Sequence, residues 1–353
     1  MSSCDLELAL DRPDRRYKVG ETITGMVGVK VNADCTCNGL TVTLQWRTHG
    51  KGNRATGTAI GGVVYKGPWK AGERHVHPFE FKLPRGPVTY HGHDLNVDWY
   101  VTATADLPWA LDPRAEVDLV ASPDGAPEPY DLGPKFAESQ RLAIDTLPVV
   151  RIVTTIVAGA FMAVGGSLAF TIAAEAIRAA ANGDAATQLL AAVPFAVIPT
   201  AFAGFGAWQI YKIWSNVLAE RALGPVRLEP TAARLLPGQP LNVALAFTPR
   251  RDLAIDAIRA TFTGTEMVSS GSGTNRSSYT HIVHEQVIDL PVPPNVRANN
   301  EVSSGGQFTV PGTAAPSFAA TDNELRWAVK VDVSVRSAPD WSGVVVIGVL
   351  PAP

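Results

Sequence analysis

Residues 152–174 read IVTTIVAGAFMAVGGSLAFTIAA and residues 189–211 read LLAAVPFAVIPTAFAGFGAWQIY, and neither run contains a charged side chain. At about 1.5 Å of helical rise per residue, each run extends about 34 Å, enough to cross a hydrocarbon core of about 30 Å. We therefore expect two transmembrane helices. The alternative is a buried helical hairpin in a soluble protein, but such helices normally keep a polar face, which both runs lack.

The charges around the two runs predict their orientation. The segment that joins them, 175–188, carries only one basic residue, Arg178. Six basic residues flank the outer ends: Lys135, Arg141, Arg151, Lys212, Arg221 and Arg227. Under the positive-inside rule this asymmetry places both flanking regions in the cytoplasm and the connecting loop outside. The expected location is the inner or plasma membrane, with two spans and the lipid bilayer as a partner.

Small residues recur every four positions on both runs. They are Gly159, Ala163 and Ser167 on the first, and Ala196, Thr200 and Gly204 on the second. Such stripes let helix backbones approach closely. We expect them to form the contact between the two helices, and they also make a homo-oligomer an open expectation.

The region before the hairpin, residues 1–121, has the two-residue period of β-strands. Leu6, Leu8 and Leu10 alternate with other residues, and GLTVTLQWR (39–47) places its apolar side chains on one face. About seven short strands separated by Gly/Pro turns, without a helical period, predict a β-sandwich. Residues 122–147 follow as a Pro/Gly-rich linker and a short pre-membrane segment, in which 135–147 has an amphipathic, helix-like pattern.

Two stretches of this first region resemble the arrestin-like family. YKVGETITGMV (17–27) fits the pattern Y-x-x-G-E-x-I-x-G-x-V. FKLPRGPVTYHGHDLNVDWYVTATAD (81–106) fits a second pattern through Phe81, Leu83, Pro84, Tyr90, Gly92, Trp99, Val101 and Ala103, with Thr89 where the family has Ser. The resemblance implies an immunoglobulin-like sandwich and a role in trafficking, adaptor or signalling assemblies.

The region after the hairpin, residues 224–353, repeats the first. Leu228 and Gly238 correspond to Leu10 and Gly20 at an offset of 218, and LRWAVKV (325–331) corresponds to VDWYVTA (97–103) at an offset of 228. The repeat predicts a second sandwich of the same kind. The expected fold class is therefore mainly β, with two arrestin-like sandwiches separated by a membrane hairpin (148–220).

Composition excludes some classes of function. The net charge is −3, from 30 basic and 33 acidic residues, so a clustered basic face for nucleic acid is not expected. Three cysteines are too few for a disulfide framework. Because the sequence shows no nucleophile elbow, phosphate loop or dinucleotide fingerprint, we expect a protein that is not an enzyme and that needs no cofactor.

Four histidines form the sharpest polar cluster. His75 and His77 are two apart on a predicted strand and so share a face, while His91 and His93 lie in a predicted loop near Asp94. Imidazoles with a carboxylate are suitable ligands for zinc. The alternative is four separate surface histidines. His281 and His284 are three apart on a predicted strand, so we expect them to face opposite ways.

Three functions remain open. The first is a membrane-anchored binding or scaffold protein that presents two sandwiches to an unidentified protein partner at the cytoplasmic face, with strand addition as the generic mode. The second is a metal-binding or metal-dependent protein that uses His75, His77, His91 and His93. The third is an accessory subunit of a membrane transport or secretion assembly.

Overall fold

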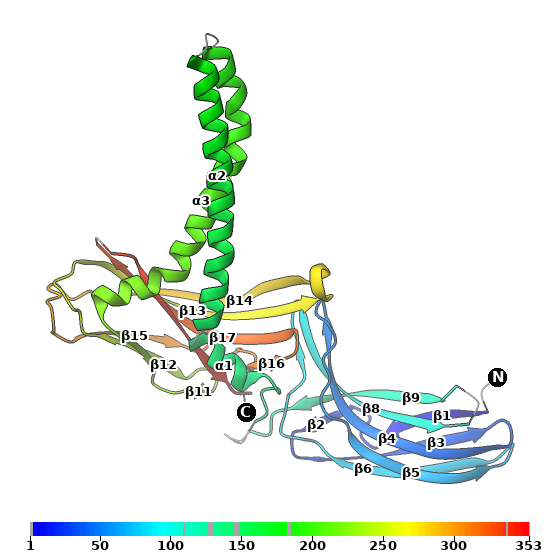
Figure 1. Ribbon diagram of the computed structural model, residues 1–353. Coiled ribbons are helices and arrows are strands. Elements are labelled where there is room, and N and C mark those ends of the chain that lie inside the picture. The colour runs from blue at the N-terminus through cyan, green and yellow to red at the C-terminus, as the bar shows by residue number, and fades with distance from the viewer. Residues whose placement is uncertain are drawn as a thin grey trace.

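The computed structural model describes residues 3–108, 111–125, 130–144, 148–181, 185–336 and 338–352. Two β-sandwiches lie side by side, and a long helical hairpin rises from the second of them (Figure 1). The prediction of a mainly β chain is confirmed. Residues 126–129 of the predicted linker and 182–184 of the predicted inter-helix loop lie outside the described residues.

In the described part of the first sandwich, nine strands form two sheets. They are β1 (Cys4–Leu10), β2 (Arg16–Lys18), β3 (Thr22–Val31), β4 (Cys35–Gly50), β5 (Ile60–Trp69), β6 (Arg74–Lys82), β7 (Tyr90–His91), β8 (Leu95–Asp106) and β9 (Arg114–Ser122). One sheet has the order β1-β3-β6 and the other the order β2-β9-β8-β4-β5, with β7 paired to β8. Alternate side chains of β4 and β8 are buried between the sheets, as the two-residue period predicts.

The second sandwich has the same topology. Its strands are β10 (Val226–Pro230), β11 (Arg234–Leu235), β12 (Pro240–Phe247), β13 (Ile255–Ser270), β14 (Ser277–Leu290), β15 (Val302–Thr309), β16 (Phe318–Ala320), β17 (Asn323–Val335) and β18 (Trp341–Val349). The sheets run β10-β12-β15 and β11-β18-β17-β13-β14, with β16 paired to β17. Each strand of the second sandwich therefore corresponds to the strand nine places earlier in the chain, in the first sandwich.

Two buried tryptophans show how closely the repeat is kept. The indole N–H of Trp99 donates to the carbonyl of Pro87 at 2.7 Å, and that of Trp327 donates to the carbonyl of Ala315 at 2.9 Å. Both tryptophans are 2 % exposed, and each reaches back twelve residues in the chain. The sequence offset of 228 thus joins residues with the same structural role.

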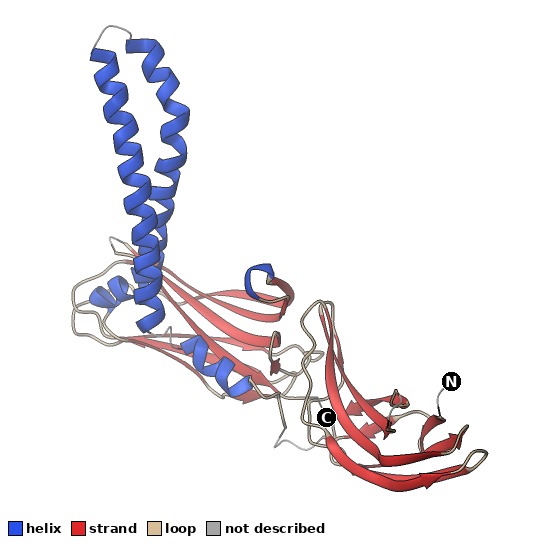
Figure 2. Cartoon of the chain, turned by 45° about the vertical axis from the view of Figure 1, so that its right-hand side comes forward, coloured by secondary structure: helices blue, strands red, loops and turns tan. Residues whose placement is uncertain are grey.

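The described residues also contain four helical segments. They are α1 (Phe136–Ile144), α2 (Pro148–Ala181), α3 (Ala185–Leu223) and the short η1 (Gly273–Asn275). The helices α2 and α3 run side by side (Figure 2). Within the part of the chain that the structure describes, one segment is long and apolar enough to cross a membrane: Thr154–Arg178, with mean hydropathy 1.9 and 11 % buried.

The contact between α2 and α3 is not made where the small-residue stripes predict it. Side chains added at Gly159 and Gly204 would enter open space, so these positions face outward. The close contacts lie at Gly165, where an added Cβ would be 2.6 Å from the Pro199 carbonyl oxygen, and at Gly206, where it would be 2.6 Å from that of Ala158. Ala158 and Gly165 on α2 are seven residues apart, and so are Pro199 and Gly206 on α3. A spacing of seven residues is the period of a left-handed helix pair.

The last turns of α3 belong to the core of the second sandwich. Ala219 and Leu223 are fully buried in it. The side chain of Asn216 both donates to the carbonyl (2.7 Å) and accepts from the amide (3.0 Å) of Ser342 on β18. One continuous helix therefore joins the apolar hairpin to the second sandwich.

The predicted linker between the first sandwich and the hairpin is packed between the two sandwiches. Tyr130 and Leu132 are each 5 % exposed and lie in one cluster with Phe136. The amide of Asp131 donates to Arg85 in the first sandwich, and the amide of Ala319 in the second donates to Leu132. This segment holds the sandwiches together, which its Pro/Gly-rich composition does not indicate.

Candidate functional site: a buried carboxylate between the sandwiches

Glu266 is fully buried where the two sandwiches meet. It lies on the inner face of β13, in the alternation that also buries Phe262 and Val268. Its carboxylate accepts three hydrogen bonds from the first sandwich: from the Tyr90 hydroxyl at 2.5 Å, and from the backbone amides of His93 at 3.1 Å and Asp94 at 2.7 Å. A buried carboxylate with three donors is satisfied as an anion.

The turn that receives Glu266 depends on a glycine. A Cβ added at Gly92 would lie within 1.9 Å of the Glu266 carboxylate, so only glycine leaves room for it. Burial and the neighbouring carboxylate raise the pKa of Tyr90 well above its ordinary range, which keeps its hydroxyl a donor. Tyr90 and Gly92 are the residues that carry the Y-x-G part of the second sequence motif. Here Tyr90 donates to a carboxylate of the other sandwich, and Gly92 leaves room for that carboxylate.

Charged and aromatic side chains surround this contact. Asp94 accepts from Lys51 at 2.7 Å, and its other close partner is the Nδ1 atom of His93, also at 2.7 Å. The hydrogen bond from Lys51 is the main cause that lowers the pKa of Asp94. The imidazole of His93 stacks on His281 of β14, with ring centroids 4.2 Å apart.

A second polar contact ties the loop between β4 and β5 to the second sandwich. The side-chain amide of Asn53 donates to the Asp322 carboxylate at 2.8 Å and to the Gly271 carbonyl at 3.0 Å, and its oxygen accepts from the Gly271 amide. The Asn323 side chain donates to the Asn53 carbonyl at 2.6 Å. The contacts at Glu266, at Asn53 and in the packed linker therefore help to fix the angle between the sandwiches.

The four predicted metal ligands lie at opposite ends of the first sandwich. His75 and His77 are on β6, and the His75 ring packs against Trp69 on β5. Trp69 pairs with Cys35 at the start of β4, which places this histidine pair at that end of the sandwich. His91 and His93 lie beyond the other end, near His49. The strand between Cys35 and His49 is about 46 Å long at about 3.3 Å per residue.

Each predicted ligand has its own neighbours instead. His75 contacts Glu73 at 3.0 Å, His77 packs against Tyr65, and His91 contacts Asp98 at 2.7 Å. Among the residues that the structure describes, no group of three or more His, Cys, Asp or Glu side chains is placed to hold a metal ion. The two histidine pairs are thus not brought together within one copy of the chain.

The expectation for His281 and His284 is wrong. The pairing between β13 and β14 skips Val283, so Gly264 faces His284 and Thr265 faces Ile282. This β-bulge turns both histidines toward the inner face. His281 reaches the junction, and His284 packs against Phe262 and Trp327.

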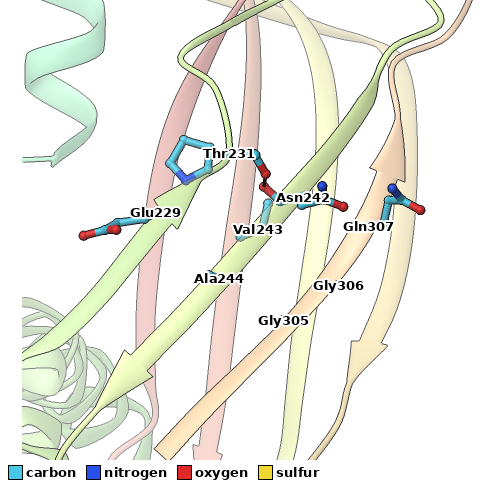
Figure 3. A pocket seen from close by; sticks show the side chains of 9 residues that line it. Glu229, Thr231, Asn242, Val243, Ala244, Gly305, Gly306 and Gln307 are labelled. Carbon is cyan, nitrogen blue, oxygen red and sulfur yellow. Dashed lines mark hydrogen bonds between the residues drawn. The ribbon is translucent and has the colours of Figure 1, made fainter.

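Shallow depressions occur at the same place in both repeats. In the second sandwich the depression lies over β10, β12 and β15, as Figure 3 shows, and it includes Glu229, Asn242 and Gln307. Its counterpart over β3 and β6, beside the end of β1, includes Thr24 and Glu80. Because both occupy equivalent positions, we attribute them to the repeated sheet shape.

Sequence patterns did not single out Glu266 or Asn53. The signal for Glu266 was present, because a carboxylate interrupts the inward-facing apolar positions of a strand. For Asn53 there was no comparable signal, since it lies in a Gly-rich connection that looks like any exposed loop.

Comparison with known proteins adds little. No family model matches the chain, and no curated protein matches it. Among solved structures, the sporulation control protein Spo0M from Bacillus subtilis is similar at 22 % identity, over 34 % of this chain and 50 % of that chain, with a TM-score of 0.29. The match spans half of the length of Spo0M, and at this score it supports no conclusion about function.

Proposed function

We propose that the chain is a membrane-anchored, non-enzymatic binding or scaffold protein. In this proposal α2 and α3 both cross the inner or plasma membrane, and both sandwiches lie on the cytoplasmic side. The observation that carries the proposal is the continuity of α3. Its apolar side chains Val197, Ile198, Phe202 and Phe205 are exposed, and its last turns, with Ala219 and Leu223, are core residues of the second sandwich. A helix anchored at both ends holds the sandwich at a fixed height and angle beside the bilayer.

The first sandwich offers an edge for a protein partner. β5 is the terminal strand of its sheet, and it exposes Val63 (61 %) and Ile60 (38 %). Edge strands of natural proteins are usually blunted by charge or by cover, so an apolar edge favours strand addition. The junction at Glu266 and Asn53 would keep this edge at a constant orientation to the membrane.

The experiment places a photo-crosslinking amino acid at Val63 in the full-length protein in its own host membrane. Met26 serves as the matched control, because it is 51 % exposed but lies on β3, the central strand of its sheet. We expect one cytoplasmic protein to be crosslinked from position 63 and not from position 26. With the crosslinker kept at position 63, an added Ile60→Lys substitution should abolish the same product, since charge on an edge opposes strand addition.

Two results would contradict the proposal. The first is release of the protein from membranes by alkaline carbonate, which would show that no helix of the protein spans the bilayer. The second is an absence of reproducible crosslinked products from position 63, which would show that no protein partner binds at the β5 edge. Elemental analysis of the purified protein tests the metal alternative separately, and stoichiometric zinc would favour it.

A further inference from the structure

Strand β14 exposes an apolar row at the edge of the second sandwich. It is the terminal strand of its sheet, and it carries Ile282 (53 % exposed), Val287 (49 %) and Val283 (40 %). The bulge at Val283 leaves this residue and its neighbour Ile282 both exposed. A row of this kind on a long strand is unusual for a surface that faces only water.

The helices show how close the second sandwich lies to the apolar segment. The indole of Trp214 on α3 donates to the hydroxyl of Thr155 on α2 at 3.0 Å, so these residues are level with each other. Asn216, which binds Ser342 of β18, follows only two residues later, about 3 Å along the helix. The apolar segment begins at Thr154. No spacer therefore separates the sandwich from the start of this segment.

The edge that carries the apolar row faces the far end of the hairpin. In Figure 1 β14 and η1 lie on the side of the second sandwich toward the tip of the hairpin, whereas β11 and β12 lie on the opposite side, and Figure 2 shows η1 on the same side. The headgroup layer on each side of a bilayer is roughly 5–7 Å thick. The second sandwich starts level with the apolar segment, and its β14 edge lies toward the tip of the hairpin, so an inserted hairpin brings this edge to that layer.

We propose that the β14 edge of the second sandwich rests in the headgroup layer of the bilayer, with Ile282, Val283 and Val287 in contact with lipid. The inference rests on the proposed function, because it requires the hairpin to be inserted. The second sandwich is then held to the bilayer at two places, by the hairpin and by this edge.

The side chains around the row suit this environment. Tyr279 is 39 % exposed and lies beneath the ammonium of Lys51, with 5.5 Å between the nitrogen and the ring centroid. Tyrosine and lysine are typical of membrane–water interfaces. Asp289 is paired with Arg259 at 3.1 Å, and Glu285 lies between the valines, where the polar headgroups can solvate it.

The test uses the full chain in liposomes whose acyl chains carry a quencher. An environment-sensitive fluorophore is attached to a cysteine at one of three positions in a Cys35→Ser background, since Cys4 and Cys37 are fully buried. The positions are Ile282 on the proposed edge, Gln307 on the exposed face of β15, and Phe170 on the hairpin, which is 75 % exposed. We expect quenching at 170 and 282 and full fluorescence at 307.

The three labels separate failure of the inference from failure of the proposed function. Quenching at 170 without quenching at 282 would overturn the inference and leave the membrane anchor intact. Loss of quenching at both positions would overturn the anchor and the inference with it. A label at 282 that is unquenched in liposomes but protected from aqueous quenchers in host membranes would assign this edge to a protein strand instead.

Discussion

The Tyr90 hydroxyl of the first sandwich and the Glu266 carboxylate of the second lie 2.5 Å apart, and they form the centre of the junction between the sandwiches. The two residues are 176 positions apart in the chain, with the whole hairpin between them. The contact therefore reports whether both sandwiches have folded and met, which makes it the most informative place for mutation.

Replacing Tyr90 with phenylalanine should lower the free energy of unfolding by about 1–3 kcal/mol, because a buried acceptor loses one of its donors. Denaturant unfolding of the purified protein measures this change. Tyr279→Phe is the matched control, since that ring is 39 % exposed and touches lysine rather than a carboxylate. Equal effects of the two variants would show that the junction contact contributes nothing specific.

Replacing Gly92 with alanine should open the junction. The new methyl group would collide with the Glu266 carboxylate, and such overpacking typically costs about 1–3 kcal/mol. Limited proteolysis of the 130–136 segment, which is packed only while the sandwiches touch, gives the readout. Gly312→Ala is the control, because nothing lies within 4 Å of the added Cβ there. Unchanged proteolysis in Gly92→Ala would argue against a tight fit.

The junction should weaken in alkali. The pKa of Tyr90 is raised above its ordinary value of 10.0 by burial and by Glu266. A group with a raised folded-state pKa contributes stability that is fully present below its unfolded-state value and lost as the pH rises through the folded-state value. Stability should therefore fall above pH 10, and Tyr90→Phe should reduce that fall. The same slope in both proteins, measured by chemical denaturation, would contradict the assignment.

The hairpin should tolerate leucine on its outer face and not at its contact. Gly165→Leu and Gly206→Leu place a side chain against the backbone of the opposite helix, whereas Gly166→Leu and Gly204→Leu enter open space. All four gain similar helix propensity, so the difference reports packing alone. Crosslinking between cysteines at Thr155 and Trp214, which contact each other, should decline only in the first pair.

The outward glycines also test the accessory-subunit alternative. If α2 and α3 associate with other membrane helices through the face that carries Gly159 and Gly204, leucine there should abolish a larger complex in native mass spectrometry and leave the crosslink between Thr155 and Trp214 intact.

Strand periodicity was sufficient to predict both sandwiches, because burial on one face forces alternation, as in Leu40 to Trp46. The repeat was visible because its two copies keep the same tryptophan. The helix contact was predicted at the wrong glycines, since spacing alone does not say which face meets a neighbour. The junction required the tertiary fold, because Glu266 and Asn53 find their partners only when segments more than 170 residues apart meet.

The end of α3 has a consequence for the order in which the protein is made. Ala219 and Leu223 are core residues of the second sandwich, yet they precede all of its strands and are continuous with the hairpin. The second sandwich therefore assembles around a helix end that is already in place. During synthesis α3 is complete before any strand of the second core exists, and the residues of the Glu266 contact are all made before β14 to β18.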